Sequence, residues 1–278
     1  MKATYDRLSQ ICSKATTRLY STSFSLGILL LSKEVRQPIY SIYGFVRLAD
    51  EIVDSFHDFE KAELLAEFRK DCFTAIQRGI SLNPILNAFQ NVVNRFGIEQ
   101  ELIEQFLHSM QMDLSEQRYT PEKYERYILG SAQVVGLMCL HVFTNGMHQE
   151  YHRLKIPAMK LGSAFQKVNF LRDIKADYQL LNRSYFPELN LSELDDISKR
   201  IIEEDIEREF KEALVGIKQL PESCKIGVYL AYLYYQQLLY KISKVPAKRI
   251  MLERIRIADW QKFLLMMSSY ISCKLNRI

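Results

Sequence analysis

The stretch PIYSIYGFVRLADEIVD, which runs from Pro38 to Asp54, decides the fold. Its apolar residues occupy most of the circumference of a helix, and a helix that is apolar all round is buried. The same stretch carries Arg47, Asp50 and Glu51. Because charged groups are costly to remove from water unless an opposite charge accompanies them, it predicts an interior helix whose carboxylates need a cation.

The rest of the chain also reads as helix. Nearly every segment has apolar residues at a period of 3.6, and no convincing alternating strand is bounded by hairpin dipeptides. Turn and cap signals predict about ten helices, at residues 4–17, 34–55, 59–78, 84–95, 99–115, 121–144, 147–180, 192–217, 221–243 and 247–272. Because no linker, low-complexity segment or repeat separates two halves, we expect a single all-α domain over residues 1–278.

The composition excludes several classes of protein. With 48% apolar and 25% charged residues, the chain can bury a large core. Its net charge of +4 is too small and too dispersed to suggest non-specific nucleic-acid binding. The five cysteines are odd in number and never spaced C-x-x-C, which argues against a disulfide framework and favours a reducing cytoplasm. The apolar run from Tyr127 to Gln149 contains His141 and Asn145, so we predict a buried core helix there, not a membrane span.

A first pair of carboxylates lies on the interior helix. Asp50 and Asp54 are four residues apart and share one face, and Tyr43 and Arg47 lie on the same stripe. Like charges at this spacing destabilise an isolated helix by roughly 0.2–0.5 kcal/mol. A single pair of this kind is most often a solvated face or an internal ion pair, so it predicts little alone.

A second pair of carboxylates makes a shared metal site a better explanation of the first pair. Asp173 and Asp177 follow Gln166 and Asn169 at near four-residue steps, which places two amides and two carboxylates on one helical stripe. Oxygen ligands without His or Cys suit a hard cation, and Mg²⁺ is commonly held by one or two carboxylates together with substrate phosphates. If the two helices face each other, Mg²⁺ ions could bridge the four carboxylates to a diphosphate, with Arg47 and Arg172 contacting its oxygens.

Departure of a diphosphate leaves a carbocation, which requires a dry apolar cavity with aromatic faces. The chain has 15 Phe and 16 Tyr for such a cavity. Aromatic enrichment alone more often reflects ordinary core packing.

Taken together, these segments resemble the squalene/phytoene synthase family, the head-to-head type of trans-isoprenyl diphosphate synthase. The resemblance runs from Tyr20 to Ile257. The stretches that carry it are STSF (21–24), YSIYGFVRLADEIVD (40–54), YILGSAQVVG (127–136), AFQKVNFLRDIKADY (164–178) and RSYFP (183–187). The family implies the isoprenoid synthase fold, in which helices surround a central hydrophobic cavity.

The resemblance also implies roles for individual residues. It implies that Asp50, Asp54, Asp173 and Asp177 bind Mg²⁺, with Mn²⁺ as an alternative ion and Asn169 as a further ligand. The same four aspartates are implied to be catalytic, together with Tyr43 and Arg47. The residues implied to bind substrate are Ser23, Tyr127, Gln166, Asn169, Arg172, Arg183 and Tyr185, the last two in a loop that closes over the products' diphosphate.

The implied activity is the condensation of two geranylgeranyl diphosphates, through prephytoene diphosphate, to phytoene for carotenoid biosynthesis. The tail RIRIADW (254–260) is similar to the closing segment of bacterial phytoene synthases. No nicotinamide-binding element is found, so no NADPH is expected. The family commonly has a small residue at Gln133, on a helix expected to line the tunnel, so Gln133 leaves the local shape of the pocket open.

Several alternatives remain open at this point. A C30 dehydrosqualene or squalene synthase that uses farnesyl diphosphate would need a shallower pocket. Head-to-tail chain elongators and terpene cyclases also use aspartate-bound metal ions to assist departure of a diphosphate. They have DDxxD motifs, whereas the first motif here is DEIVD. A non-catalytic helical assembly factor with the same fold would be expected to lack the four aspartates.

The sequence also leaves the location open in part. We expect a cytoplasmic protein, with contact to the inner membrane face through residues 263–267 near Lys262 and Lys274 as an alternative. An interior helix face is the favoured explanation of that apolar patch. The oligomeric state is not specified by the sequence.

Overall fold

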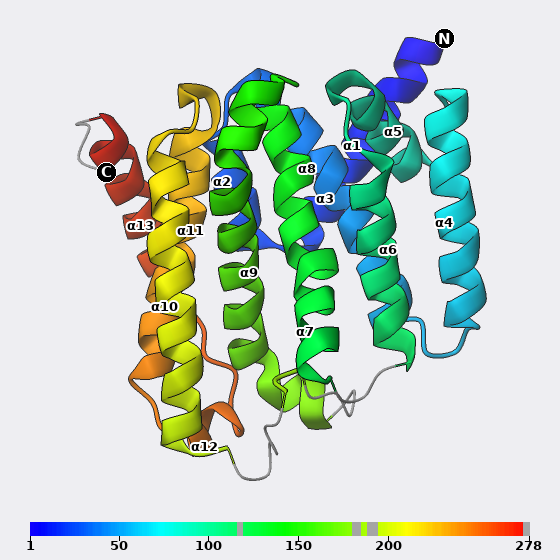
Figure 1. Ribbon diagram of the computed structural model, residues 1–278. Coiled ribbons are helices and arrows are strands. Elements are labelled where there is room, and N and C mark those ends of the chain that lie inside the picture. Colours follow the sequence, from blue (N-terminus) through cyan, green and yellow to red (C-terminus); the bar gives the residue numbers. More distant parts are fainter. Residues whose placement is uncertain (116–118, 180–184, 188–193, 275–278) are drawn as a thin grey trace.

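The computed structural model describes residues 1–115, 119–179, 185–187 and 194–274 (Figure 1). Within these ranges the chain forms helices and no strand, so the predicted all-α fold is confirmed. The helices are α1 (Lys2–Tyr20), α2 (Thr22–Leu29), α3 (Lys33–Asp54), α4 (Lys61–Arg78), α5 (Pro84–Phe96), α6 (Gln100–Ser115), α7 (Pro121–Ile128), the π-helical segment η1 (Leu129–Gln133), α8 (Val134–Phe143), α9 (His148–Gln179), α10 (Asp196–Lys218), α11 (Glu222–Ser243), α12 (Ala247–Ile250) and α13 (Asp259–Lys274).

Helix α3 is enclosed by other helices, as its apolar circumference predicts. It packs against α1, α4, α5, α6 and α8. Phe45 and Val53 on α3 are fully buried, and the ring of Phe45 stacks on that of Phe89 with centroids 3.9 Å apart. The first carboxylate pair is therefore carried on the most enclosed part of the fold.

Helix α9 runs between two groups of buried side chains. One group is built mainly from α2 to α6 and α8, and the other mainly from α7 and α9 to α12. Helix α9 contributes to both, with Tyr151 and Leu154 in the first group. Helix α9 packs along α10, α8 and η1 and lies near the centre of the view in Figure 1. Val228 of α11 packs against both groups. That residues 1–278 form one domain stays a prediction.

Helix α2 was not among the helices predicted from sequence. The side chain of Ser21 caps it by accepting a hydrogen bond from the backbone N–H of Phe24 at 3.2 Å. The helix then packs against α11. Its residues are apolar on most sides, with too few polar positions to give a clear helical period.

The predicted helix at 247–272 is wrong, because the structure divides it into α12 and α13. The non-helical residues between them are held by long-range contacts. Lys175 donates to the carbonyl of Leu252 at 2.7 Å, Lys241 donates to the carbonyl of Arg256 at 2.9 Å, and Ile257 is buried. These contacts outweigh the local helical preference of the segment.

The predicted helix at 121–144 is interrupted by η1, so that α7, η1 and α8 follow one another. Pro121–Phe143 has the length and hydropathy of a membrane span, but 56% of its apolar window is buried inside the protein. It packs against α6 and α9, as the sequence predicted for a core helix.

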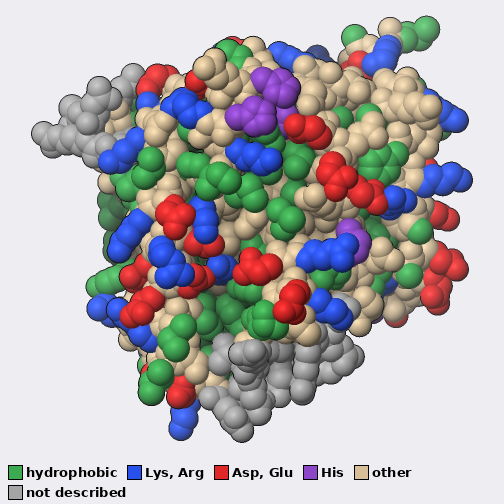
Figure 2. Space-filling model, in the orientation of Figure 1, with side chains coloured by type: hydrophobic (Ala, Val, Ile, Leu, Met, Phe, Trp, Pro, Cys, Tyr) green, Lys and Arg blue, Asp and Glu red, His purple; other side chains and the backbone are tan. Residues whose placement is uncertain are grey.

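Two expectations from composition match the structure. All five cysteines are free thiols. Over the face shown in Figure 2, acidic and basic side chains are interspersed, with no large area of one sign. The small net charge is therefore dispersed on this face, as expected.

Replacing Phe45 with Ala tests the enclosure of α3. We expect Phe45→Ala to lower the free energy of unfolding by about 3–5 kcal/mol, because it leaves a cavity against Phe89. Denaturant unfolding measures the loss. Leu82→Ala is the control, since Leu82 is 93% exposed. Equal stability of the two variants would contradict the packing described.

Candidate active site

The first carboxylate stripe lies on α3 around Arg47. The guanidinium of Arg47 donates to the carboxylates of both Asp50 and Glu51, and it lies 4.4 Å from the ring centroid of Tyr20. Asp54, one turn beyond Asp50, is partly buried. One arginine thus pairs with two carboxylates at the start of the stripe.

Arg47 does not fully neutralise Asp50. About a third of the Asp50 side chain is exposed (35%), yet it lies in a recess crowded by protein atoms. Burial, together with the negative charges of Asp54 and Asp113, raises the pKa of Asp50 to about 7, although Arg47 opposes the rise. The recess therefore favours any additional cation.

Tyr43 stands one turn before Arg47. Its ring stacks on that of Phe24 with centroids 4.5 Å apart. Burial, with a smaller contribution from neighbouring Tyr235, raises the pKa of Tyr43 to about 12. The hydroxyl is therefore neutral at physiological pH.

The second stripe lies on α9. The Arg172 Nε donates to the Asp173 carboxylate at 3.0 Å, and the Arg254 Nε lies 2.6 Å from the same carboxylate. Asn169 accepts a hydrogen bond from the hydroxyl of Tyr235 at 3.2 Å. Asp173 is thus paired with two arginines, one from its own helix and one from the segment between α12 and α13.

Tyr235 of α11 joins the two stripes. It contacts Asn169 on α9 and is close enough to Tyr43 on α3 to influence its pKa. Its ring stacks on Phe165 with centroids 4.1 Å apart. Phe165 and Phe24, the ring partners of Tyr235 and Tyr43, line one pocket, so the two stripes lie in the same region of the molecule.

A third cluster lies beside them. Asp113 of α6 accepts hydrogen bonds from the hydroxyls of Tyr127 at 2.7 Å, Tyr185 at 3.1 Å and Tyr119 at 3.3 Å. The ring of Tyr185 stacks on Phe170, the residue after Asn169, with centroids 4.2 Å apart. Two of the implied substrate-binding residues, Tyr127 and Tyr185, are therefore tied to one buried carboxylate.

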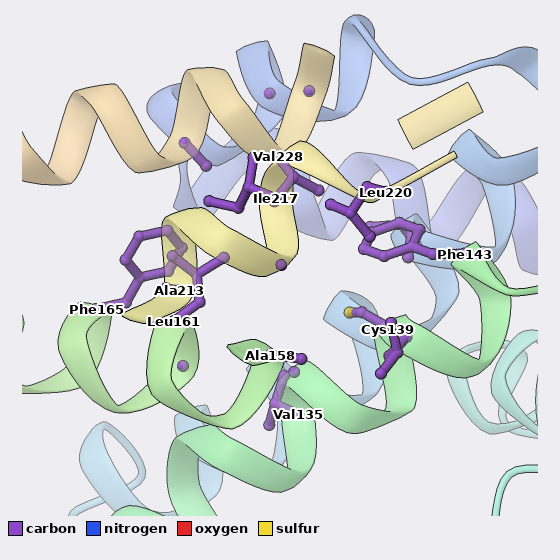
Figure 3. Close-up of a pocket in the computed structure, with 18 of the residues that line it drawn as sticks. Val135, Cys139, Phe143, Ala158, Leu161, Phe165, Ala213, Ile217, Leu220 and Val228 are labelled. Atoms are coloured by element: carbon purple, nitrogen blue, oxygen red, sulfur yellow. The ribbon is translucent and has the colours of Figure 1, made fainter. Parts of the chain in front are cut away.

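An apolar pocket extends from this region between α2, α3, η1, α8, α9, α10 and α11. It encloses about 1150 Å³, its open mouth included. Figure 3 shows side chains such as Val135, Phe143, Leu161 and Ile217 around the space. Because α8 and α9 run in opposite directions, Ser131 and Gln166 lie toward the carboxylate end, and Phe143 and Leu154 toward the far end.

Small residues let the helices around the pocket approach closely. A Cβ on Gly162 would lie 2.6 Å from the carbonyl oxygen of Ala132, and one on Gly227 would lie 2.6 Å from that of Gly27. Gln133 is not among the residues that line the pocket. The pocket shape that Gln133 left open is set on this wall by Ala132 and Gly136 instead.

The donor set fits a hard divalent ion. Carboxylate and amide oxygens are the ligands that Mg²⁺ takes, and the arginines on Asp50 and Asp173 mark where positive charge is stabilised. Within the described part of the chain, no three His, Cys, Asp or Glu side chains are grouped closely enough to hold a metal ion by themselves. A metal ion here would be bound weakly until oxygens from another source, such as a diphosphate, complete its set of ligands.

The predicted site residues fall into three groups. One group lies on α3 and consists of Tyr43, Arg47, Asp50 and Asp54. A second lies on α9 and consists of Gln166, Asn169, Arg172 and Asp173, and Asn169 accepts a hydrogen bond from Tyr235. Tyr127 and Tyr185 lie together at Asp113. Arg183 and the side chains of Ser23 and Asp177 lie outside the described residues.

Sequence reasoning missed Asp113, Tyr235 and Arg254 as members of the site. The only sequence signal for Asp113 is its position on an otherwise apolar face of α6. Tyr235 is one of 16 tyrosines and carries no signal of its own. Arg254 belongs to the tail whose similarity was noted without a role.

The sequence pattern of the squalene/phytoene synthase family matches residues 17–261. The chain belongs to this family. The resemblance stated from the motifs is therefore confirmed, and the isoprenoid synthase fold with it.

Curated relatives carry the name phytoene synthase. The chain is 28% identical to phytoene synthase 1, chloroplastic, of Zea mays over 87% of its own length and 62% of the relative's. It is 26% identical to the Narcissus pseudonarcissus enzyme, over 87% and 60%. The chain thus spans about three fifths of the length of these plant relatives. Identity to the Arthrospira platensis phytoene synthase is 24%, over 92% of the chain and 90% of the relative.

Solved structures share the fold. A dehydrosqualene synthase superimposes with a TM-score of 0.83 at 20% identity, covering 97% of this chain and 98% of that one. Squalene synthase HpnC from Alicyclobacillus acidocaldarius gives 0.73 at 21% identity, covering 90% and 97%. Helices around a central apolar pocket are therefore the common architecture.

Removing Arg254 tests whether it competes with a metal for Asp173. An ion pair this exposed is worth up to about 1 kcal/mol, so we expect Arg254→Ala to tighten Mn²⁺ binding in the absence of diphosphate by up to about fivefold. Electron paramagnetic resonance of free Mn²⁺ measures the affinity. Arg249→Ala is the control, because Arg249 forms a similar exposed pair with Glu253. Weaker Mn²⁺ binding by Arg254→Ala would show that Arg254 supports the metal instead.

Proposed function

We propose that the protein is a phytoene synthase, a Mg²⁺-dependent prenyltransferase of carotenoid biosynthesis. It would join two geranylgeranyl diphosphates head to head in a 1′-1 linkage, through prephytoene diphosphate, and release diphosphate. The observation that carries the proposal is that the α3 and α9 carboxylate stripes lie beside one apolar pocket, whose wall includes Phe24 and Phe165, the ring partners of Tyr43 and Tyr235. Membership in the family and the names of the relatives support the same reaction.

The first half-reaction is the ionisation of one substrate. When bound, Mg²⁺ would neutralise the leaving diphosphate and weaken its bond to C1. Asp50, Asp54 and Asp173, with Asn169, would hold the ion, and Asp177 would join them by the family's pattern. In this proposal Arg47 and Arg172 turn from their carboxylates toward the diphosphate oxygens, since each guanidinium already lies at the site.

The surroundings suit the allylic cation that results. The stacked pairs Phe24–Tyr43 and Phe165–Tyr235 offer aromatic faces near the mouth of the pocket. The apolar walls exclude water, which would otherwise quench the cation. The double bond of the second substrate can then attack C1 to give the cyclopropylcarbinyl diphosphate.

The second half-reaction loses this diphosphate, rearranges and ends with loss of a proton. Tyr43 and the departing diphosphate were the two candidate acceptors from sequence. Because burial raises the pKa of Tyr43 to about 12, its hydroxyl keeps its own proton at neutral pH. We therefore favour the diphosphate as the final base, and no NADPH is required for this ending.

Pocket length supports a C20 substrate. The wall from Ser131 to Phe143 spans about 18 Å at the helical rise of ~1.5 Å per residue. That length is comparable to an extended geranylgeranyl chain and exceeds an extended farnesyl chain. The alternatives are a C30 product from farnesyl diphosphate and a non-catalytic helical assembly factor.

Product analysis tests the proposal. We expect the purified protein with Mg²⁺ to convert geranylgeranyl diphosphate to phytoene, equally with and without NADPH. Mass spectrometry and absorbance identify the hydrocarbon. A C30 product formed in preference from farnesyl diphosphate would contradict the chain length, and no product from either substrate would favour the assembly factor.

Charge removal tests the carboxylate stripes. We expect Asp50→Asn and Asp173→Asn to fold but to lower kcat by about 10²-fold or more, because each removes a charge that would hold the metal. Steady-state kinetics with Mg²⁺ measure the loss. Glu104→Gln is the control, since Glu104 pairs with Arg69 on the surface. Normal turnover in either aspartate variant would contradict the proposal that these carboxylates hold the metal ion.

We also propose that the protein is cytoplasmic and touches the inner membrane face through α13. Several large apolar residues of this helix lie exposed at helical spacing, namely Trp260, Phe263, Leu264, Met267, Tyr270 and Ile271. The favoured explanation from sequence, an interior face, is wrong for Phe263, Leu264 and Met267. An exposed apolar stripe of this kind suits a lipid surface that receives an oily product.

Vesicle binding tests this contact. We expect the double variant Phe263→Ser, Leu264→Ser to lose co-sedimentation with phosphatidylglycerol vesicles while soluble turnover is retained. Leu82→Ser is the control, because Leu82 is also exposed but lies far from α13 in the sequence. Unchanged sedimentation of the double variant would contradict the proposed contact.

A further inference from the structure

Asp113 is a buried carboxylate that the proposed mechanism does not use. It lies near the end of α6 and is only 7% exposed. The hydroxyls of Tyr119, Tyr127 and Tyr185 donate to it. A carboxylate that accepts several hydrogen bonds is stabilised in its ionised form.

The three tyrosines come from different parts of the chain. Tyr119 precedes α7, Tyr127 lies on α7, and Tyr185 follows α9, 72 residues after Asp113. Their rings lie within 5.1–5.3 Å of one another, centroid to centroid. One carboxylate therefore fixes the hydroxyl ends of a packed aromatic cluster.

This arrangement decides what the hydroxyls can do. A tyrosine hydroxyl has one proton, and in Tyr127 and Tyr185 that proton points to Asp113. Burial and the charge of Asp113 keep the pKa of Tyr127 well above its ordinary value, so the proton stays on the phenol. Neither the hydroxyl of Tyr127 nor that of Tyr185 then has a proton to offer to another group.

The cluster borders the reaction region. Phe170, whose ring lies 6.0 Å from that of Tyr127 and 4.2 Å from that of Tyr185, centroid to centroid, directly follows Asn169 on α9. We propose that Asp113 is a positioning residue that commits the hydroxyl protons of Tyr127 and Tyr185, so that both phenols act toward reacting groups only as hydrogen-bond acceptors and never as donors to diphosphate. Electron-rich oxygens of this kind suit a carbocation or a hydrated metal ion, and the effect on turnover rests on the proposed function.

Replacing Asp113 with Asn separates binding from turnover. The amide has the shape of the carboxylate but can itself donate, which releases a tyrosine proton. We expect Asp113→Asn to lower kcat by about tenfold or more while the Kd for Mg²⁺ with inorganic pyrophosphate stays within about threefold or tightens. Calorimetry with pyrophosphate and steady-state kinetics give the two values. A pyrophosphate Kd weakened tenfold, or unchanged kcat, would overturn the proposal.

The matched control is Glu209→Gln. Glu209 is also buried, at 5% exposed, and accepts a hydrogen bond from Ser163, at the α9–α10 contact. We expect it to lower the melting temperature without changing kcat. If Asp113→Asn behaved in the same way, its role would be structural only and the proposal would fail.

Phenylalanine variants carry the test if Asp113→Asn does not fold. We expect Tyr127→Phe and Tyr185→Phe to lower kcat but to leave the pyrophosphate Kd within about twofold, since neither hydroxyl donates to the diphosphate. Where Asp113→Asn does fold, adding it to Tyr127→Phe should lower kcat by less than about threefold, because the two residues act as a unit. Additive losses, or weaker pyrophosphate binding in either phenylalanine variant, would contradict the proposal.

Failure of the proposed function can be recognised separately. If the wild-type protein makes no hydrocarbon from C15 or C20 diphosphates, the pyrophosphate measurements on Tyr127→Phe and Tyr185→Phe still decide whether the phenols donate. An unchanged Kd would support the inference about the tyrosines, and a weakened Kd would refute it.

Discussion

The structure depends on the balance of charge among carboxylates that lie beside an apolar pocket. Asp50 and Asp173 would be unfavourable in such a place without positive partners. Arg47 supplies one on α3, and Arg172 and Arg254 supply two on Asp173. The same need for positive charge makes the region receptive to divalent ions, so structural stability and ion binding draw on the same electrostatic interaction.

The pocket itself depends on small residues where helices meet. Close approach at Gly162 and Gly227 brings η1, α2, α9 and α11 together around a space that no side chain fills. Longer side chains, such as Phe143 and Leu220, lie around the space. Small residues where the helices touch and larger residues around the pocket thus together set the shape of the interior.

Local signals made much of this fold predictable. The apolar circumference of residues 38–54 identified the buried helix. Helix α5 begins at Asn83, whose side chain accepts a hydrogen bond from the backbone N–H of Ile85, and ends at Gly97, which has a left-handed conformation. The two aspartate stripes were also visible, because residues four apart share a helix face. Each of these features is set by residues close together in the sequence.

The parts that sequence reasoning missed depend on distant contacts. Tyr235 meets Asn169 across 66 residues, and Tyr185 meets Asp113 across 72. The break between α12 and α13 arises because Lys175 and Lys241 hold backbone carbonyls of residues with helical propensity. The periodicity of a sequence does not show which distant residues will contact each other, so composition and spacing could not predict these pairs.

The segment between α12 and α13 connects the carboxylate stripe of α9 with the exposed apolar stripe of α13. It pairs with Asp173 through Arg254, and a few residues later it begins the helix with the exposed apolar stripe. An ion that displaces Arg254 would also loosen the tether at the start of α13. If α13 contacts lipid as we propose, ion binding at Asp173 and the lipid contact would be coupled through one short stretch of backbone.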